Sequence, residues 1–568
     1  MQVRLAYNGH STFKRSDRGA ELNMLPNLAR EPVAFDAPLL QPLRFREAIS
    51  ALHDVAINDL RYQPRDKTAY VEWKRQESRR LAQIRSEAYE QERQDILARR
   101  ATVPPDLERQ FEACRRKYWD ARQAYSDYLL KHDQELWRLL MPCDPIVTVA
   151  DDVLFLECFS ADESSYGCLT VEREAMFGPS NEYRRGTTNV DYSWPLYDHF
   201  QQLRTYRETR FRVDPQGFEL ATTGGGDFRE EKIDLPAGWL RGLMHVQAAM
   251  TMPMRRVTLS REAVYSLLAW LKRHKARRSP RALRFELLPY QPARIVVEPW
   301  EQAIVAHGVT YAGPGGEPIR IWGARRLLSL ARLLPLVDRF DVYLLGTGLP
   351  SFWVGQLGDM RLTLGLSGWT TNDWTRGAAL DLLAPPVQLS PGLVTGVAGW
   401  LQNKRAADLN DAGLRSVAAQ GECAAALNYL ARTGQVIFDL GAKVYRWRQI
   451  MPAAVGEADL GPEPAELTAS RQLVARGDVK LTKRQALGGG GELLVGYYSA
   501  PKNEIELLLD GDGRMKRAKC NCSYFYKGGL RLGPCRHLLA LRDTAAKQAE
   551  RTTSLDDWYR QWQRWAAN

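Results

Sequence analysis

The residues with the clearest chemical meaning lie near the C-terminus, as two pairs of potential metal ligands. Cys520 and Cys522 form the first pair, and Cys535 and His537 follow after a spacer of twelve residues. Three thiolates and one imidazole complete a tetrahedral shell around Zn²⁺, and a shell filled by four protein ligands is structural rather than catalytic. The spacing therefore predicts a closed zinc site that stabilises the fold around it.

The elements around these ligands must bring both pairs to one point. Residues 493–498 and 504–509 are typical of a strand hairpin, and a third strand should lead into Cys520, with a small bend that turns Cys520 and Cys522 toward one ion. Pro534 suits the start of a helix, which places Cys535 at a helix N-terminus, where the dipole favours a thiolate. Nearby cations should stabilise the three thiolates: Lys516, Arg517, Lys519 and Arg536.

The pattern Cys-x-Cys, spacer, Cys-x-His, placed after a strand hairpin and before an apolar helix, resembles the SWIM zinc finger over about residues 485–545. That resemblance implies zinc as cofactor and a role in DNA binding or protein contacts. Residues 321–326, 344–353 and 364–369 also look like bacterial SWIM proteins encoded beside MoxR-type AAA+ ATPases and von Willebrand A proteins. This second resemblance implies a multi-protein system and supplies no reaction.

A basic run offers a different function. The chain carries a formal net charge of +11, which suits nucleic acid or an acidic protein partner. The cations of the run, together with the four around the zinc ligands, are candidate phosphate contacts for sequence-nonspecific binding: Lys272, Arg273, Lys275, Arg277 and Arg278. The alternative interpretation is a solvated charged face.

Motifs for common enzymes are missing from the sequence. There is no Gly-x-x-x-x-Gly-Lys-Ser/Thr loop for ATP and no His-Glu-x-x-His, and Gly365-x-Ser367-Gly368 misses the spacing of a nucleophile elbow. We therefore expect a non-enzymatic protein, although an unrecognised enzyme in residues 143–390 is a third hypothesis. With no long apolar stretch and no apolar leader in Met1 to Phe13, we expect a cytoplasmic chain without a membrane span.

The length of 568 residues predicts several domains of α+β class. We divide the chain into an N-terminal segment at 1–62, a helical hairpin resembling a coiled coil at 63–142, an α+β body at 143–390, a winged-helix-like module at 391–451, and the zinc-finger domain at 471–568. The hairpin pairs helices at about 66–100 and 105–140; it can serve as a rigid arm or pack flat on the body.

Hydrophobic periodicity predicts the remaining elements. Helices are expected at 44–62, 261–274, 322–334, 393–404, 408–419 and 422–432, strands at 146–149, 153–159, 284–288, 294–298, 341–347, 436–440 and 443–448, and a linker at 452–470. In a winged helix, 422–432 would be the groove-reading helix. Its sparse polar groups favour a protein-docking or purely structural module.

A final helix is expected to carry a stripe of large side chains, Leu555, Trp558, Trp562 and Trp565, after a capping Thr553-Ser554. The stripe either packs on the zinc-finger domain or anchors a partner, since Trp is enriched at binding hot spots.

Overall fold

The computed structural model describes only part of the chain. The described residues are 5–7, 12–15, 19–24, 26–27, 33–58, 113, 117, 124, 128, 145–190, 200, 203, 205, 208–213, 230–232, 239–252, 254–368, 374, 389–451, 454–455, 465–488, 491–499, 503–509, 515–532 and 534–549. The chain divides into two compact units, one of Met1–Asn58 with Pro142–Asn568 and one of Asp59–Met141. In the second unit, Ala113, Lys117, Ala124 and Tyr128 are helical and exposed. The remainder of the predicted helical hairpin, like the tryptophan stripe, lies outside the described residues.

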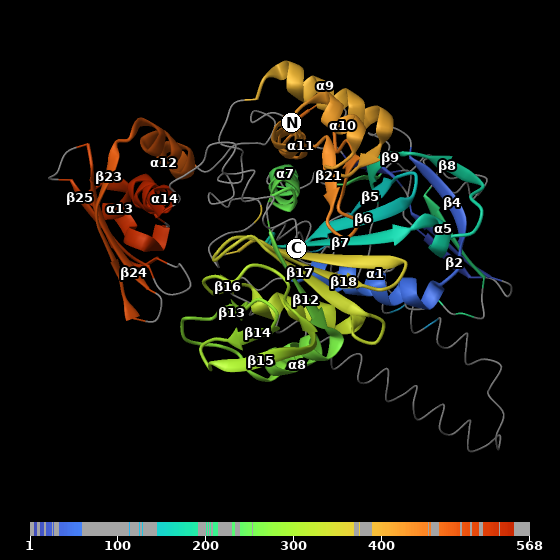
Figure 1. Cartoon of the computed structure of the whole chain (residues 1–568), viewed down its shortest axis with the longest axis horizontal. Helices are drawn as coiled ribbons and strands as arrows, with labels where there is room; N and C mark the ends of the chain where they lie inside the picture. Colours follow the sequence, from blue (N-terminus) through green and yellow to red (C-terminus); the bar gives the residue numbers. More distant parts are fainter. Residues whose placement is uncertain are drawn as a thin grey trace. The chain divides into compact units, whose positions relative to one another are not determined.

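An antiparallel sheet of eight strands is the largest in the described residues (Figure 1). Its strands are, in spatial order, β12 (Arg255–Ser260), β17 (Arg339–Leu344), β18 (Ser351–Gln356), β19 (Met360–Leu366), β7 (Ser165–Glu172), β6 (Val153–Phe159), β5 (Ile146–Val149) and β9 (Gly186–Asn189). The register places Leu156 opposite Leu169, and Leu169 opposite Leu362. The predicted strands at 146–149 and 153–159 are thereby confirmed.

Both faces of this sheet are buried. Successive side chains of a strand point to opposite faces, so Leu154 and Leu156 enter one core while Val153 and Phe155 enter another. Helix α1 (Pro42–Ala56) covers the first face, and α7 (Trp239–Met250) contributes to the core on the second. This two-sided burial explains why β6 begins Val-Leu-Phe-Leu, with no alternation of apolar and polar residues.

Smaller sheets complete the body. One has the order β2 (Thr12–Arg15), β3 (Gly19–Met24), β10 (Glu208–Val213), β4 (Ala34–Leu39) and β8 (Glu182–Arg184), with β3 and β10 parallel. Another has the order β15 (Gln302–Thr310), β14 (Pro292–Val297), β13 (Leu283–Glu286) and β16 (Ile319–Ile321), and a further pair joins β1 (Leu5–Tyr7) to β11 (Glu230–Lys232). Helix α8 (Arg261–Arg273) packs on β15, and α5 (Arg173–Met176) is a single turn.

Three predicted elements of the body differ from the observed ones. The first helix ends at Ala56 instead of 62. The predicted helix at 322–334 is a 3₁₀ segment, η1 (Ala324–Leu333), which begins after Gly323 in a left-handed conformation with φ of 85°. The predicted strand at 341–347 stops at Leu344, because Gly346 and Gly348 have positive φ angles and turn the chain.

Residues 391–451 contain the predicted three helices followed by a hairpin. The elements are α9 (Pro391–Lys404), β20 (Ala406–Ala407), α10 (Ala412–Val417), α11 (Gln420–Arg432), β21 (Val436–Asp439) and β22 (Val444–Trp447), and the strands form one sheet in the order β20-β22-β21. Helix α10 is shorter than predicted because the Asp408 side chain accepts from the Asn410 backbone N–H in a turn and Asp411 caps the helix.

A buried ion pair fixes this module to the large sheet. Nη2 of Arg448 lies 2.7 Å from both carboxylate oxygens of Glu157 on β6, and both side chains are at most 1% exposed. Tyr166 donates to Glu157 at 2.6 Å, and burial raises the pKa of Tyr166, which keeps it protonated as a donor. On the other side of the module, the Asn428 side chain of α11 donates to the carbonyl of Ala248 in α7.

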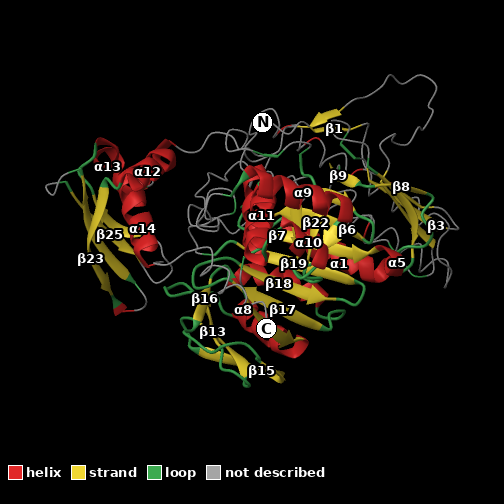
Figure 2. Ribbon diagram, turned by 45° about the horizontal axis from the view of Figure 1, so that its top comes forward, coloured by secondary structure: helices red, strands yellow, loops and turns green. Residues whose placement is uncertain are grey.

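The C-terminal domain is a four-stranded antiparallel sheet with helices on it. Its elements are α12 (Ala465–Arg476), β23 (Val479–Ala486), β24 (Glu492–Tyr498), β25 (Glu504–Leu509), β26 (Met515–Lys519), α13 (Ser523–Gly528), the 3₁₀ turn η5 (Gly529–Leu532) and α14 (Arg536–Ala549). Helix α14 packs on the sheet and on α12 (Figure 2). The predicted hairpin, the third strand and the helix after Pro534 are confirmed.

The sequence prediction did not include α12, β23, α13 or η5. The predicted linker at 452–470 is wrong beyond 464, where α12 begins. This helix buries only Leu467 and Ser470, so its apolar signal is weak. Strand β23 lies at the edge of the sheet and exposes most of its polar side chains, which is typical of edge strands that resist aggregation.

Candidate metal centre

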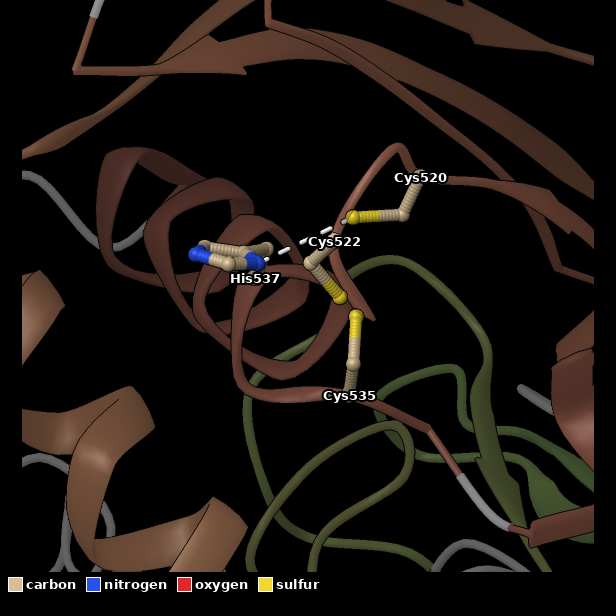
Figure 3. Close-up of side chains that lie close together, drawn as sticks. All are labelled: Cys520, Cys522, Cys535 and His537. Carbon is tan, nitrogen blue, oxygen red and sulfur yellow. Dashed lines mark hydrogen bonds between the residues drawn. The ribbon is translucent and has the colours of Figure 1, made fainter. Parts of the chain in front are cut away.

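The four predicted ligands converge at one point of the C-terminal domain. Cys520 directly follows β26, Cys522 is the N-cap of α13, Cys535 directly precedes α14, and His537 lies in the first turn of α14. Their sulfur and nitrogen ligand atoms all lie within 4.8 Å of one another (Figure 3). Sγ of Cys520 and Nδ1 of His537 are 3.7 Å apart. This cluster can hold one metal ion.

Cys520 and Cys522 lie in the short segment that joins the end of β26 to the start of α13. The predicted bend is present: β26 stops at Lys519, and Asn521 separates Cys520 from the N-cap position. The backbone N–H of Phe525 donates to Sγ of Cys522 at 3.4 Å. An N-cap side chain normally satisfies one of the free N–H groups of the first helical turn, so this bond holds the sulfur toward the other ligands.

Electrostatics set the protonation of the thiols. Cys520 and Cys535 are 6% and 0% exposed. A hydrogen bond from Cys520 lowers the pKa of Cys535 to about 4, with further help from His537 and from the Leu538 N–H at the start of α14. The same contact raises the pKa of Cys520, and burial raises the pKa of Cys522. One thiolate is therefore favoured by the protein alone, and a bound cation is needed to hold all three.

Two neighbouring side chains position the ligand helix. The rings of Tyr498 and His537 are stacked, with centroids 3.7 Å apart and an interplanar angle of 16°. Glu466 of α12 accepts from the backbone N–H of Arg536 at 2.7 Å and from its guanidinium at 2.6 Å. A carboxylate at this place both caps α14 and favours its dipole. Spacing to the ligand pairs could not reveal either residue, since both lie on elements far from the motif.

The structure divides the candidate nucleic-acid contacts of the C-terminal domain. Arg536 is paired with Glu466, and Arg517 is paired with Glu506 at 3.1 Å. Lys516 and Lys519 are exposed on β26. Two of the four predicted cations thus already have acidic partners within their own domain.

The other five candidates belong to the body. Lys272 and Arg273 end α8, and the rest of the run continues in irregular backbone. The side chains of Lys272, Arg273, Lys275, Arg277 and Arg278 are all exposed, and none has an ion pair with a described acidic residue. The run is therefore an uncompensated positive surface in the described part of the chain.

No described helix is both long and apolar enough to cross a membrane.

Comparison with known proteins finds no family and only weakly similar solved structures. No family model matches the sequence, and no curated protein is similar to it. Among solved structures, the PCNA of Entamoeba histolytica matches with 11% identity and a TM-score of 0.26, over 40% of this chain and 89% of that one. The A. fulgidus PCNA that carries the C-terminal region of FEN-1 matches with 14% identity and a TM-score of 0.28, over 40% of this chain and 91% of that one. At these TM-scores the likeness supports no statement about fold or function.

Proposed function

We propose that the cluster binds Zn²⁺ and that the chain is a non-enzymatic adaptor subunit of a bacterial multi-protein system. The observation that carries the proposal is the set of one imidazole nitrogen and three cysteine sulfur atoms within 4.8 Å of one another. Zinc with bonds of about 2.3 Å to sulfur and about 2.0 Å to nitrogen fits such a donor set, and four protein ligands leave no position for a substrate. The metal then stabilises a surface and performs no reaction.

An exposed tyrosine near the metal cluster of the C-terminal domain supports protein contacts. Tyr526 of α13 is 89% exposed, directly beyond the segment that carries Cys520 and Cys522. Tyrosine is among the residues enriched in binding hot spots. The resemblance to SWIM proteins encoded beside MoxR-type AAA+ ATPases and von Willebrand A proteins names the class of partner that we propose.

The winged-helix-like module supports the same proposal, because the helix that would enter a DNA groove is packed inside the protein. The helix that would read a DNA groove, α11, buries Cys423, Ala424, Leu427 and Asn428. Asn428 donates to Thr251 Oγ1 at 2.6 Å as well as to the α7 backbone. Because α11 packs against α7, a docking or structural role suits the module better than reading of a DNA groove.

Affinity purification of the tagged full-length chain from its native source, followed by mass spectrometry, tests the adaptor proposal. We expect an AAA+ ATPase or a von Willebrand A protein to co-purify, and Tyr526→Ala to reduce its recovery without releasing zinc. Tyr265→Ala, which removes a tyrosine that is 60% exposed on α8 of the body, is the matched control. Recovery of neither protein with the unmodified chain would contradict the proposal.

Nucleic-acid binding by the uncompensated run is the second candidate function. The observation that favours it is five exposed cations that form no ion pair with any acidic residue in the described part of the chain. Neutralising Lys272, Arg273, Lys275, Arg277 and Arg278 together should flatten the plot of log affinity against log salt by up to about 0.9 for each lost duplex phosphate contact. Neutralising Lys516, Arg517 and Lys519 tests the finger separately. If the variant with all five cations neutralised binds DNA as the parent does at every salt concentration, the run is only a solvated face.

A further inference from the structure

Three aromatic rings, Trp270, His274 and Trp300, meet beside the basic run. Trp270 and His274 stand one turn apart at the end of α8, and their rings are stacked with centroids 3.9 Å apart. Trp300, from the turn between β14 and β15, approaches His274 at 5.7 Å and Trp270 at 6.3 Å, at interplanar angles of 67° and 80°. Neither neighbour therefore lies flat on the Trp300 ring, which is 38% exposed.

His274 joins the ring cluster to the charges, because it lies between Arg273 and Lys275 in the sequence. Its ring nitrogen Nδ1 lies 3.0 Å from the carbonyl oxygen of Trp270, which fixes the ring at the helix end. The helix ends at Arg273, and the following residues leave it in an extended conformation that begins at His274. Cations of the run thus lie on both sides of His274 along the chain.

The two glutamates beside Trp300 in the sequence, and Glu286 of β13, are paired with arginines. Glu301 is bound by two nitrogen atoms of Arg284, at 2.6 and 3.0 Å, and the hydrogen bond from Arg284 lowers its pKa. The buried Glu298 is paired with Arg284 and Arg320. Glu286 is paired with Arg284 and Arg294. These three carboxylates are balanced by three guanidiniums, and none of the three forms an ion pair with the basic run.

We infer that Trp270, His274 and Trp300, with the basic run, form a binding surface for single-stranded nucleic acid. This inference rests on the nucleic-acid alternative and makes it more specific. A surface for single strands combines cations that follow the phosphates with aromatic rings on which unpaired bases stack. In a duplex the bases are stacked on each other, so an exposed ring beside the phosphate contacts adds affinity for single strands only. An acidic peptide would use the cations and leave the indole of Trp300 without a base to stack on.

The test measures binding of fluorescently labelled oligothymidylate, a duplex of the same length, and polyglutamate to the full-length chain. Trp300→Ala should weaken oligothymidylate binding at least about fivefold, since stacking of one base contributes about 1–3 kcal/mol. Trp300→Phe should keep most of the affinity, because a flat ring remains. Duplex binding should change less than twofold in both variants. Tyr265→Ala is the control, since it removes an exposed aromatic side chain of the same helix.

Crosslinking of a 5-iodouracil oligonucleotide to the unmodified chain removes the dependence on variants, and peptide mapping should place the crosslink at Trp270, His274 or Trp300. If Trp300→Ala binds oligothymidylate like the parent and no crosslink maps to the three rings, the inference is overturned. If the variant with all five cations neutralised then loses both duplex and single-strand binding, the proposal of nucleic-acid binding by the basic run still holds, although the role of the rings does not. Binding of polyglutamate as tight as that of oligothymidylate overturns the choice of ligand, and absence of all nucleic-acid binding overturns both proposals.

Discussion

Replacing Cys520 with serine is expected to release the zinc ion and to unfold residues 479–549 while the large sheet of the body stays folded. The core of this domain is small and includes Cys520 and Cys535 themselves among its buried residues. Structural zinc supplies about 10–16 kcal/mol in finger peptides, whereas whole domains are stable by only about 5–15 kcal/mol. Removing one ligand therefore removes more free energy than the domain has in reserve.

Hydrogen exchange measured by mass spectrometry distinguishes the two regions. In Cys520→Ser and in His537→Ala, amides of β24, β25 and α14 should exchange fast, and those of β6 and β7 should keep their protection. Cys423→Ser is the matched control, because Cys423 is buried in α11, outside the cluster, and donates only to the backbone oxygens of Leu414 and Ala418. Full amide protection of α14 in both ligand variants would show that the metal does not hold this domain together.

Arg448→Met is expected to destabilise the body by about 3–5 kcal/mol, the second large effect. The substitution leaves the carboxylate of Glu157, which is 0% exposed, without a cation in a buried site. Combining Arg448→Met with Glu157→Gln should recover most of the lost stability, because neither residue of the pair then carries a buried charge. The free energy of unfolding in urea measures the stability of both variants. Both are made in a chain that also carries Cys520→Ser, so that unfolding of the C-terminal domain does not contribute to the urea curve.

An exposed ion pair provides the matched control for this prediction. Arg185 and Asp151 lie 3.1 Å apart, each with a side chain that is 49% exposed. Arg185→Met should change the stability by no more than about 1 kcal/mol, because water solvates both charges. Equal effects of Arg185→Met and Arg448→Met would mean that burial does not make the Glu157 pair special.

Local sequence signals predicted the convergence of Cys520, Cys522, Cys535 and His537, and many of the helices and strands. The ligand spacing, the Gly533-Pro534 step before Cys535 and the hairpin at 493–509 are local, so they could be recognised in a single sequence. Strand β23 was missed because an edge strand rich in Lys and Arg has no apolar alternation, and α12 was missed because it buries few side chains.

Contacts between distant segments were beyond the reach of the sequence. The pairing of β7 with β19 places Leu169 against Leu362, and no local pattern selects one apolar strand as the partner of another. The same holds for the union of Trp270 and His274 with Trp300, whose ring comes from a separate turn. The basic run was visible in the sequence, whereas only the fold shows that none of the described acidic residues pairs with it.

Metal analysis of the full-length chain, purified without chelator, tests the central claim most directly. Elemental mass spectrometry should find about one zinc per chain, and a strong chelator should remove it together with the amide protection of β24, β25 and α14. A chain that contains no zinc, and whose residues 479–549 nevertheless show native amide protection, would contradict the account.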